Sequence, residues 1–271
     1  MILENNVRLH GRHGNVESLI RVLNNGAFTM EGGEISGNEA VGGGGVYIAS
    51  GGIFTKRGGE ISGNRAMGGG GVAVAGTFTM ENGLIRNNVA YGSGGGVTVR
   101  SGGIFTKWNG EISGNSAARG GGVHLHYGAV ATFTMHNGRI TDNRATVAIA
   151  GGSGNMLSGG GVSVVPFNST ASFIMAGGQI HSNSAIGGII GGFGGGVFAA
   201  DTGAFFQKTG GSIQANASRA SAGGPALTNQ GNEVFAGGIG SPAARRRENA
   251  VWDNLSFDSR NNPPTYSGVW D

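Results

Sequence analysis

The feature that most constrains the fold is a unit that begins with Phe and occurs seven times in this chain of 271 residues. In its plainest copy, Phe28-Thr-Met is followed by Glu-Ile35-Ser-Gly-Asn38 and then by glycines that lead into Val46-Tyr-Ile48. In every copy an Ile lies seven residues after the Phe, and an Asn lies three residues after that Ile. The units begin at Phe28, Phe54, Phe78, Phe105, Phe133, Phe173 and Phe206. Such a repeat predicts one elongated domain rather than two globular ones.

Each unit contains three short segments in which apolar and polar residues alternate, such as Phe-Thr-Met, Glu-Ile-Ser and Val-Tyr-Ile. Alternation with period two between Gly or Asn boundaries is typical of β-strands. A turn of roughly 24 residues with three strands is one coil of a parallel β-helix, with coils about 4.8 Å apart. A single coil buries too little apolar surface to offset the ordering of its backbone, so coils must stack. We therefore predict an all-β, parallel β-helix of about eight three-strand coils.

The Asn of each unit predicts a buried ladder along the stack. An Asn at a sharp turn tolerates the left-handed conformation, and its amide both donates and accepts hydrogen bonds. Identical Asn residues in successive coils can therefore bond to one another and to the turn backbone. The predicted ladder consists of Asn38, Asn64, Asn88, Asn115, Asn143, Asn183 and Asn216.

The two ends of the chain depart from the repeat and are predicted to be caps. Residues 1–27 hold two strand-like pieces, and we interpret them as an imperfect first coil that covers the apolar end of the stack. Residues 28–219 carry the regular repeats. In residues 220–271 prolines appear and the repeat fades, which indicates a C-terminal cap. The three parts are predicted to form one continuous domain.

Composition excludes several classes of protein. The formal net charge is +3, and Arg245-Arg246-Arg247 supply three positive charges, so 3 − 3 = 0 remains for the rest of the chain. This balance does not indicate a nucleic-acid-binding surface. The sequence has no Cys, and so no disulfide or thiolate metal site. No apolar run is long enough to span a membrane.

Two sequence motifs of the repeat resemble those of known families. Gly-Gly-Gly-Val and Ile-Ser-Gly-Asn, in alternation, resemble the paired GGA[ILV] and FxxN repeats of chlamydial polymorphic outer-membrane proteins. Gly51-Gly-Ile-Phe-Thr-Lys with Gly59-Glu-Ile-Ser-Gly-Asn64 is closer still to the Gly-rich β-helix repeats of predicted spirochaete surface proteins, particularly those of Treponema. The resemblance implies a right-handed parallel β-helix that is secreted or lies on the cell surface, with its signal or anchor outside this sequence. It implies no catalytic residue.

Departures from the repeat mark candidate binding surfaces. The interval from the Asn to the next Val is 8 or 9 residues in four units, but 19 and 14 residues in the fifth and sixth. We expect these insertions, within residues 144–160 and 184–195, to form adjacent loops at one edge. The middle residue of the third strand is expected to point outward, where aromatic side chains could stack on sugars. The candidate ligand-binding residues are Tyr47, Trp108, His124, His126, Tyr127, Phe193 and Phe198.

The sequence contains no catalytic motif, although titratable residues could be assembled into a site. Glu111 is expected to face Arg139 in the next coil, and a surface ion pair is the favoured interpretation. The histidines show no metal-ligand spacing, so we expect no metal or cofactor. The residues from which an active site could be built are Glu111, Asp142, His181 and Asp201.

The function expected from these features is that of an extracellular bacterial module, adhesin-like, that binds a polysaccharide or a surface protein. One alternative is a polysaccharide lyase or glycoside hydrolase, by analogy with the many polysaccharide enzymes that have a β-helix fold. A second alternative is a purely structural stalk. Clustered carboxylates in a groove would favour the enzyme, and a bare convex surface would favour the stalk.

Overall fold

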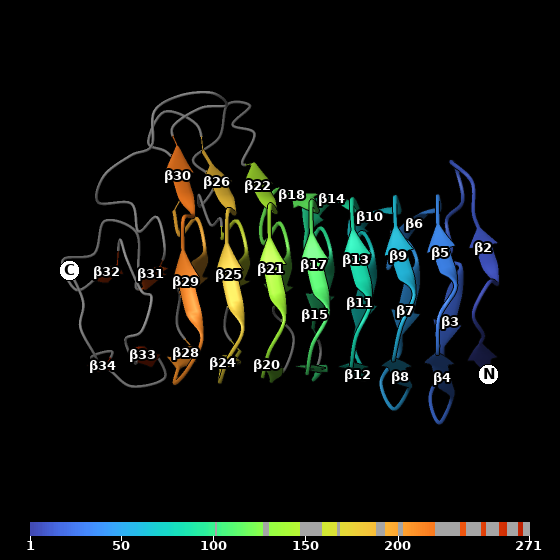
Figure 1. Cartoon of the computed structure of the whole chain (residues 1–271), viewed down its shortest axis with the longest axis horizontal. Helices are drawn as coiled ribbons and strands as arrows, with labels where there is room; N and C mark the ends of the chain where they lie inside the picture. Colours follow the sequence, from blue (N-terminus) through green and yellow to red (C-terminus); the bar gives the residue numbers. More distant parts are fainter. Residues whose placement is uncertain are drawn as a thin grey trace.

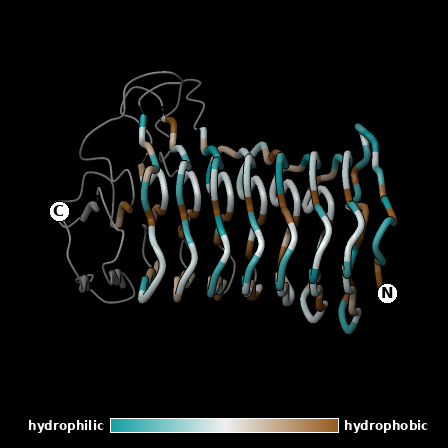
Figure 2. Tube along the Cα trace, viewed as in Figure 1, coloured by the Kyte–Doolittle hydropathy of each residue, from teal (hydrophilic) through white to brown (hydrophobic). Residues whose placement is uncertain are grey.

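The computed structural model is an elongated stack of coils with the N-terminus at one end (Figure 1). Figure 2 shows the coils in one row along the long axis, with hydrophobic and hydrophilic residues alternating within each coil. The structure describes residues 1–100, 102–126, 130–146, 159–166, 169–187, 193–199, 203–219 and 234–236, and the backbone of residues 245–247, 255–258 and 265–267. The prediction of an all-β parallel β-helix with about eight coils is confirmed.

The strands that contain the repeated Phe form a ten-stranded sheet, which we call the Phe sheet. Its strands, in order, are β1 (Ile2–Leu3), β4 (Ala27–Met30), β8 (Ile53–Lys56), β12 (Thr77–Met80), β16 (Ile104–Lys107), β20 (Ala131–Met135), β24 (Ala171–Met175), β28 (Ala204–Lys208), β33 (Leu255–Asp258) and β34 (Thr265–Ser267). All neighbours pair in parallel except β28 with β33 and β33 with β34, which are antiparallel.

The repeated Ile lies in an eight-stranded parallel sheet, the Ile sheet. Its strands are β2 (Arg8–His10), β5 (Glu34–Ser36), β9 (Glu60–Ser62), β13 (Leu84–Arg86), β17 (Glu111–Ser113), β21 (Arg139–Thr141), β25 (Gln179–His181) and β29 (Ser212–Gln214). In this sheet every Ile pairs in register with the Ile of the next coil. Identical side chains therefore lie above one another along the axis.

The strands after the glycine runs form the nine-stranded Val sheet. They are β3 (Ile20–Val22), β7 (Val46–Ile48), β11 (Val72–Val74), β15 (Val97–Val99), β19 (Val123–Leu125), β23 (Val162–Val164), β27 (Val197–Ala199), β31 (Val234–Ala236) and β32 (Arg245–Arg247). Pairing is parallel up to β31, and β32 pairs with β31 in the antiparallel direction.

A fourth strand, which the sequence pattern had not predicted, follows the Asn of each unit. These strands form the seven-stranded Ala sheet. They are β6 (Glu39–Gly42), β10 (Arg65–Gly68), β14 (Val89–Ser93), β18 (Ser116–Ala117), β22 (Arg144–Thr146), β26 (Ser184–Ile186) and β30 (Ala217–Arg219). The Ala sheet forms the upper edge of the molecule in Figure 1. Each coil from β4 (Ala27–Met30) onward therefore passes through the Phe, Ile, Ala and Val sheets in that order.

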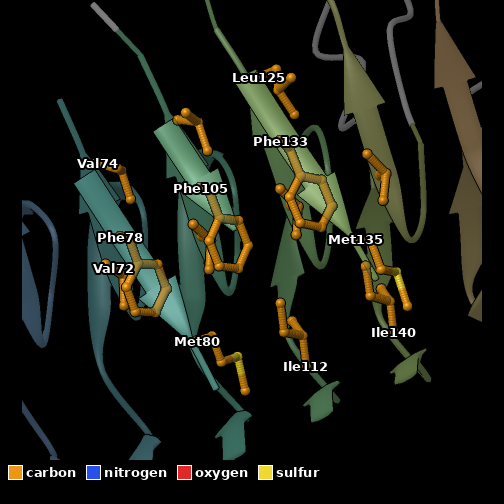
Figure 3. Packing of buried hydrophobic residues seen from close by; sticks show 14 of the residues in the cluster. Val72, Val74, Phe78, Met80, Phe105, Ile112, Leu125, Phe133, Met135 and Ile140 are labelled. Carbon is orange, nitrogen blue, oxygen red and sulfur yellow. The ribbon is translucent and has the colours of Figure 1, made fainter. Parts of the chain in front are cut away.

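The core consists of columns of like side chains that fill the space between the sheets (Figure 3). The rings of the seven repeated phenylalanines stack on one another with centroid distances from 4.6 to 5.5 Å. The Ile and Val columns are fully buried beside them. Because each coil buries its apolar residues against the coils above and below, stacking supplies the burial that one coil lacks.

The predicted Asn ladder is present from Asn38 to Asn216. Each described Asn of the ladder is nearly or fully buried, and its backbone N–H donates to the side-chain Oδ1 of the next Asn at 2.9–3.1 Å, as far as Asn183. From Asn64 to Asn183 the side-chain amide also donates to that oxygen, and from Asn64 to Asn216 it donates to the carbonyl of an Ile in the preceding coil, as in the bond from Asn115 Nδ2 to Ile85 O at 2.9 Å. The ladder thus provides partners for buried backbone groups at the Asn turns of successive coils.

At the N-terminal end, β1, β2 and β3 pair in parallel with β4, β5 and β7. Residues 1–27 therefore contribute a coil to the stack. At the other end, most of residues 220–271 lie outside the described residues, and the C-terminal cap stays a prediction. No helix in the part of the chain that the structure describes is long and apolar enough to cross a membrane.

Candidate functional site

A groove runs along the turns that connect the Phe sheet to the Ile sheet. It has a volume of about 650 Å³ and is lined by five successive coils. Each coil contributes to the same turn, so the lining residues form columns along the axis. In each coil the lining residues are consecutive in sequence. We call the central glycines the floor, namely Gly83, Gly110, Gly138, Gly178 and Gly211. We call the residues before them one wall, namely Asn82, Asn109 and Asn137, and the residues after them the opposite wall, namely Leu84, Glu111, Arg139, Gln179 and Ser212.

Only glycine fits the floor of this corner. Gly138 has a φ of 81°, a region that residues with a Cβ rarely adopt. A Cβ at this position would also lie 2.2 Å from the carbonyl oxygen of Gly110 and 2.2 Å from Nζ of Lys107. Both atoms belong to the preceding coil, so a side chain at Gly138 would clash with that coil rather than enter the groove. The glycines that the sequence places before each Ile strand thus allow adjacent coils to pack closely beneath the groove.

A column that holds Met in other coils contains three buried lysines, Lys56, Lys107 and Lys208. The ammonium groups of two of them, Lys56 and Lys107, lie against the floor glycines Gly83 and Gly138. Lys56 donates to the carbonyl oxygens of Gly58 and Gly59, both at 2.6 Å, and to Asn82 O at 3.3 Å. Lys107 donates to Gly110 O at 2.7 Å and to Asn137 O at 2.8 Å. The ammonium groups therefore tie the turns of adjacent coils together. The sequence signal was present, since Phe-Thr-Lys replaces Phe-Thr-Met in these two units, but its meaning was missed.

Burial lowers the pKa of both Lys56 and Lys107 to about 7. In the unfolded chain a Lys titrates near about 10.4, so between these values the unfolded state binds the proton more tightly. Stability therefore rises with pH from about 7 toward about 10. Below pH 7 both states are protonated and the slope disappears.

We expect the variant Lys56→Met to lose part of this pH dependence. Met fits the site because Met30 and Met80 occupy the same column in the adjacent coils. The free energy of unfolding of the natural protein, relative to the variant, should rise by up to about 1.4 kcal/mol per pH unit above pH 7. Urea unfolding of both proteins at neutral and alkaline pH measures this difference. If the difference in free energy of unfolding between the two proteins does not change with pH, the contacts with the carbonyl oxygens keep the Lys56 ammonium charged.

Trp108 and His136 are next in sequence to the Asn wall of the groove. Each immediately precedes an Asn of that wall, and the two rings stack with a centroid distance of 3.9 Å and an interplanar angle of 7°. They occupy the same position in adjacent coils, so the rings stack along the long axis. Trp108 is 51% exposed. Of the predicted ligand-binding residues it is the one beside the groove, and His136 was missed although it stands at the equivalent position of the next unit.

Glu111 is placed in the groove, where its carboxylate lies 4.0 Å from the guanidinium of Arg139. This agrees with the ion pair expected across the coils. The same contact recurs in the Ile sheet between Arg8 and Glu34, at 3.5 Å, and between Arg86 and Glu60, at 2.8 Å. Glu111 is the one carboxylate among the described residues that line the groove. Glycosidase chemistry with paired carboxylates would need a second one.

Two further candidates for catalysis, Asp142 and His181, are brought together by Thr141. The Thr141 hydroxyl donates to Asp142 Oδ2 at 2.9 Å and contacts His181 Nδ1 at 3.2 Å. The contact of a His with a hydroxyl recurs in the first coils, where His10 Nδ1 lies 3.2 Å from Ser36 Oγ. It is therefore a cross-strand pair of the Ile sheet rather than a specialised constellation. Asp201 lies outside the described residues.

The expectation of an exposed aromatic surface on the Val sheet is wrong. His124 and Phe198 are completely buried, and Phe193 is 4% exposed. Tyr47 is half-buried beneath two arginine guanidinium groups, 5.6 and 5.7 Å from its ring centroid. His126 is partly buried, with its ring 5.2 Å from that of His124. Tyr127 lies outside the described residues, as do residues 147–158 and 188–192 of the two insertions.

The glycine runs explain this burial, because they lie against the outer face of the Val sheet. A Cβ at Gly120 would be 2.7 Å from the Cβ of His124, and one at Gly94 would be 2.8 Å from the Cβ of Thr98. Thr98, His124 and Ser163 are neighbours in register, and their polar side-chain atoms have no hydrogen-bond partner among the residues that the structure describes. Burial lowers the pKa of His124 well below its ordinary value, so the ring is neutral.

Within the described residues, no three His, Cys, Asp or Glu side chains are grouped so that they could hold a metal ion. Comparison of the chain with protein-family models, curated proteins and solved structures found no match. The function is therefore argued from the groove itself.

Proposed function

We propose that this protein is a glycan-binding module of a bacterial cell surface, adhesin-like, and that the groove between the Phe and Ile sheets is its binding site. The observation that carries the proposal is the polar lining of an open groove of about 650 Å³. Asn82, Asn109 and Asn137 present amides that both donate and accept, which matches the hydroxyl groups of sugars. The resemblance of the repeat to bacterial surface β-helices supports an extracellular location.

The stacked rings of Trp108 and His136, next in sequence to the Asn wall, also support this site. Trp108 is held in place by His136, so little side-chain entropy is lost when a ligand binds beside it. Its indole N–H is a further donor at the ring edge. A preorganised rim and a polar groove favour recognition of a hydroxyl-rich chain over recognition of an apolar peptide.

Affinity electrophoresis against plant, mucin and bacterial polysaccharides tests this function, with each sample also assayed for new reducing or unsaturated ends. We expect retardation by at least one polysaccharide and no new ends. New ends would indicate a lyase or hydrolase, and Glu111, Asp142, His181 and Asp201 would then be substituted. The absence of retardation by every polysaccharide would favour a structural stalk.

The site is tested by the variant Trp108→Ala, which we expect to weaken polysaccharide binding about 5- to 30-fold, because it removes a preorganised aromatic contact. The matched control is Tyr91→Ala, which removes an exposed aromatic side chain from the Ala sheet, away from the groove. The control should bind as the natural protein does. Equal losses in both variants would place the glycan elsewhere.

A further inference from the structure

The groove has a direction, because its lining repeats from coil to coil. Five successive coils contribute the same turn positions, and the neighbouring strands pair in register from β13 to β29. The columns of the two walls therefore run parallel to the long axis of the molecule (Figure 1). A ligand that contacts equivalent residues in several coils must lie along this axis.

The repeat distance of the groove is set by backbone hydrogen bonding between coils, at about 4.8 Å. This distance is close to the length of one sugar ring in an extended glycan chain. Each ring of such a chain, laid along the groove, would therefore meet the same wall position in the next coil. Asn82, Asn109 and Asn137 would each face one ring.

The exposed charges of the groove indicate a neutral ligand, because Lys56 and Lys107 beneath the floor are buried and bonded to backbone carbonyl oxygens. Glu111 and Arg139 lie on the same wall in adjacent coils, and their charged groups are 4.0 Å apart. One negative and one positive charge in contact leave no net charge on that wall. The opposite wall and the remaining lining residues are amides, a hydroxyl, an apolar side chain and glycines. Neither a polyanionic nor a polycationic chain is favoured by this lining.

The length of the site follows from the same columns. The Asn wall covers three coils, and glycine takes the equivalent place in the next two, at Gly177 and Gly210. The opposite wall continues through Gln179 to Ser212. A ligand in the groove would therefore contact both walls over three coils and only one wall over the next two.

We propose that the groove binds one extended strand of a neutral glycan parallel to the long axis, with one sugar ring opposite each coil over five coils. This inference rests on the proposed glycan-binding function and adds the pose, the charge class and the length of the ligand.

The test uses linear β-linked oligomers of glucose, xylose, mannose and N-acetylglucosamine, from one sugar to about eight, titrated against the whole protein by calorimetry. For the series that binds, affinity should rise several-fold with each added sugar up to the five that the groove accommodates, and then remain constant. A single sugar that binds as tightly as the oligomers would overturn the axial pose while leaving glycan binding intact. The absence of binding by every oligomer and every polysaccharide would overturn both proposals.

Variants along the Asn wall give a second readout. Asn82→Ala, Asn109→Ala and Asn137→Ala should each weaken binding of the longest oligomer by a similar factor of about 3 to 10, because each removes contacts to one ring. A short oligomer that fills only part of the wall should respond less to the two outer variants. A loss confined to one of the three positions would show that the chain crosses the groove instead of following it.

Discussion

The variant Asn115→Ala should unfold at a markedly lower temperature than the natural protein, with a loss of about 2–4 kcal/mol in the free energy of unfolding. Asn115 Oδ1 accepts hydrogen bonds from the backbone and side-chain amides of Asn88, and its Nδ2 donates to Ile85 O and Asn143 Oδ1. All four groups are buried in the ladder. Alanine removes all four bonds: the backbone N–H of Asn88 loses its ladder acceptor, while Asn88 Nδ2 keeps Ile61 O and Asn143 Oδ1 keeps the backbone N–H of residue 115.

Thermal unfolding followed by circular dichroism measures this effect. The control is Asn109→Ala, whose side chain is exposed in the groove outside the ladder. That variant should change the free energy of unfolding by less than about 0.5 kcal/mol. Unchanged melting of Asn115→Ala would contradict the buried ladder.

A second large effect is expected from Gly95→Ala, which adds a methyl group where two coils meet. The new Cβ would lie 2.4 Å from the carbonyl oxygen of Gly121 and 2.6 Å from that of Ser116. These are backbone atoms of the next coil, and they cannot move without stretching the hydrogen bonds that join the coils. We expect a loss of about 3 kcal/mol or more, at the upper end of what overpacking costs.

The matched control for this clash is Gly68→Ala, because a Cβ at Gly68 would approach no atom more closely than 3.7 Å. Chemical denaturation of both variants separates the effect of contact from that of replacing glycine in general. If the two variants lose the same free energy of unfolding, the close approach of the coils at Gly95 is not what requires glycine there.

The repeat in the sequence was sufficient to predict the architecture, because the residues that define it are those that the fold buries. Phe105, Ile112 and Asn115 recur at fixed spacing, and each lies in a buried column of like residues. Fixed spacing within the unit places equivalent residues at the same position around each coil. A parallel stack of in-register coils satisfies that requirement.

The candidate surface could not be predicted in the same way, because burial of the outer faces depends on neighbouring segments. His124 alternates with two inward aliphatic residues, which correctly indicates a strand, but the pattern does not show that the Gly120 backbone covers its outer face. The groove was missed for a related reason. It follows a column of turns with closely packed glycines such as Gly138, and only the path of the backbone shows that these turns line up.

The orientation of the hydrogen bonds has a mechanical consequence. In all four sheets the bonds between coils run along the long axis, because the strands lie across it. A force that pulls the two ends of the stack apart therefore acts on the junctions between coils in series, and each junction opens separately. Every coil released in this way frees roughly 24 residues, or about 80 Å of extended chain. Under tension along its axis, the protein should lengthen in steps while the remaining coils stay folded.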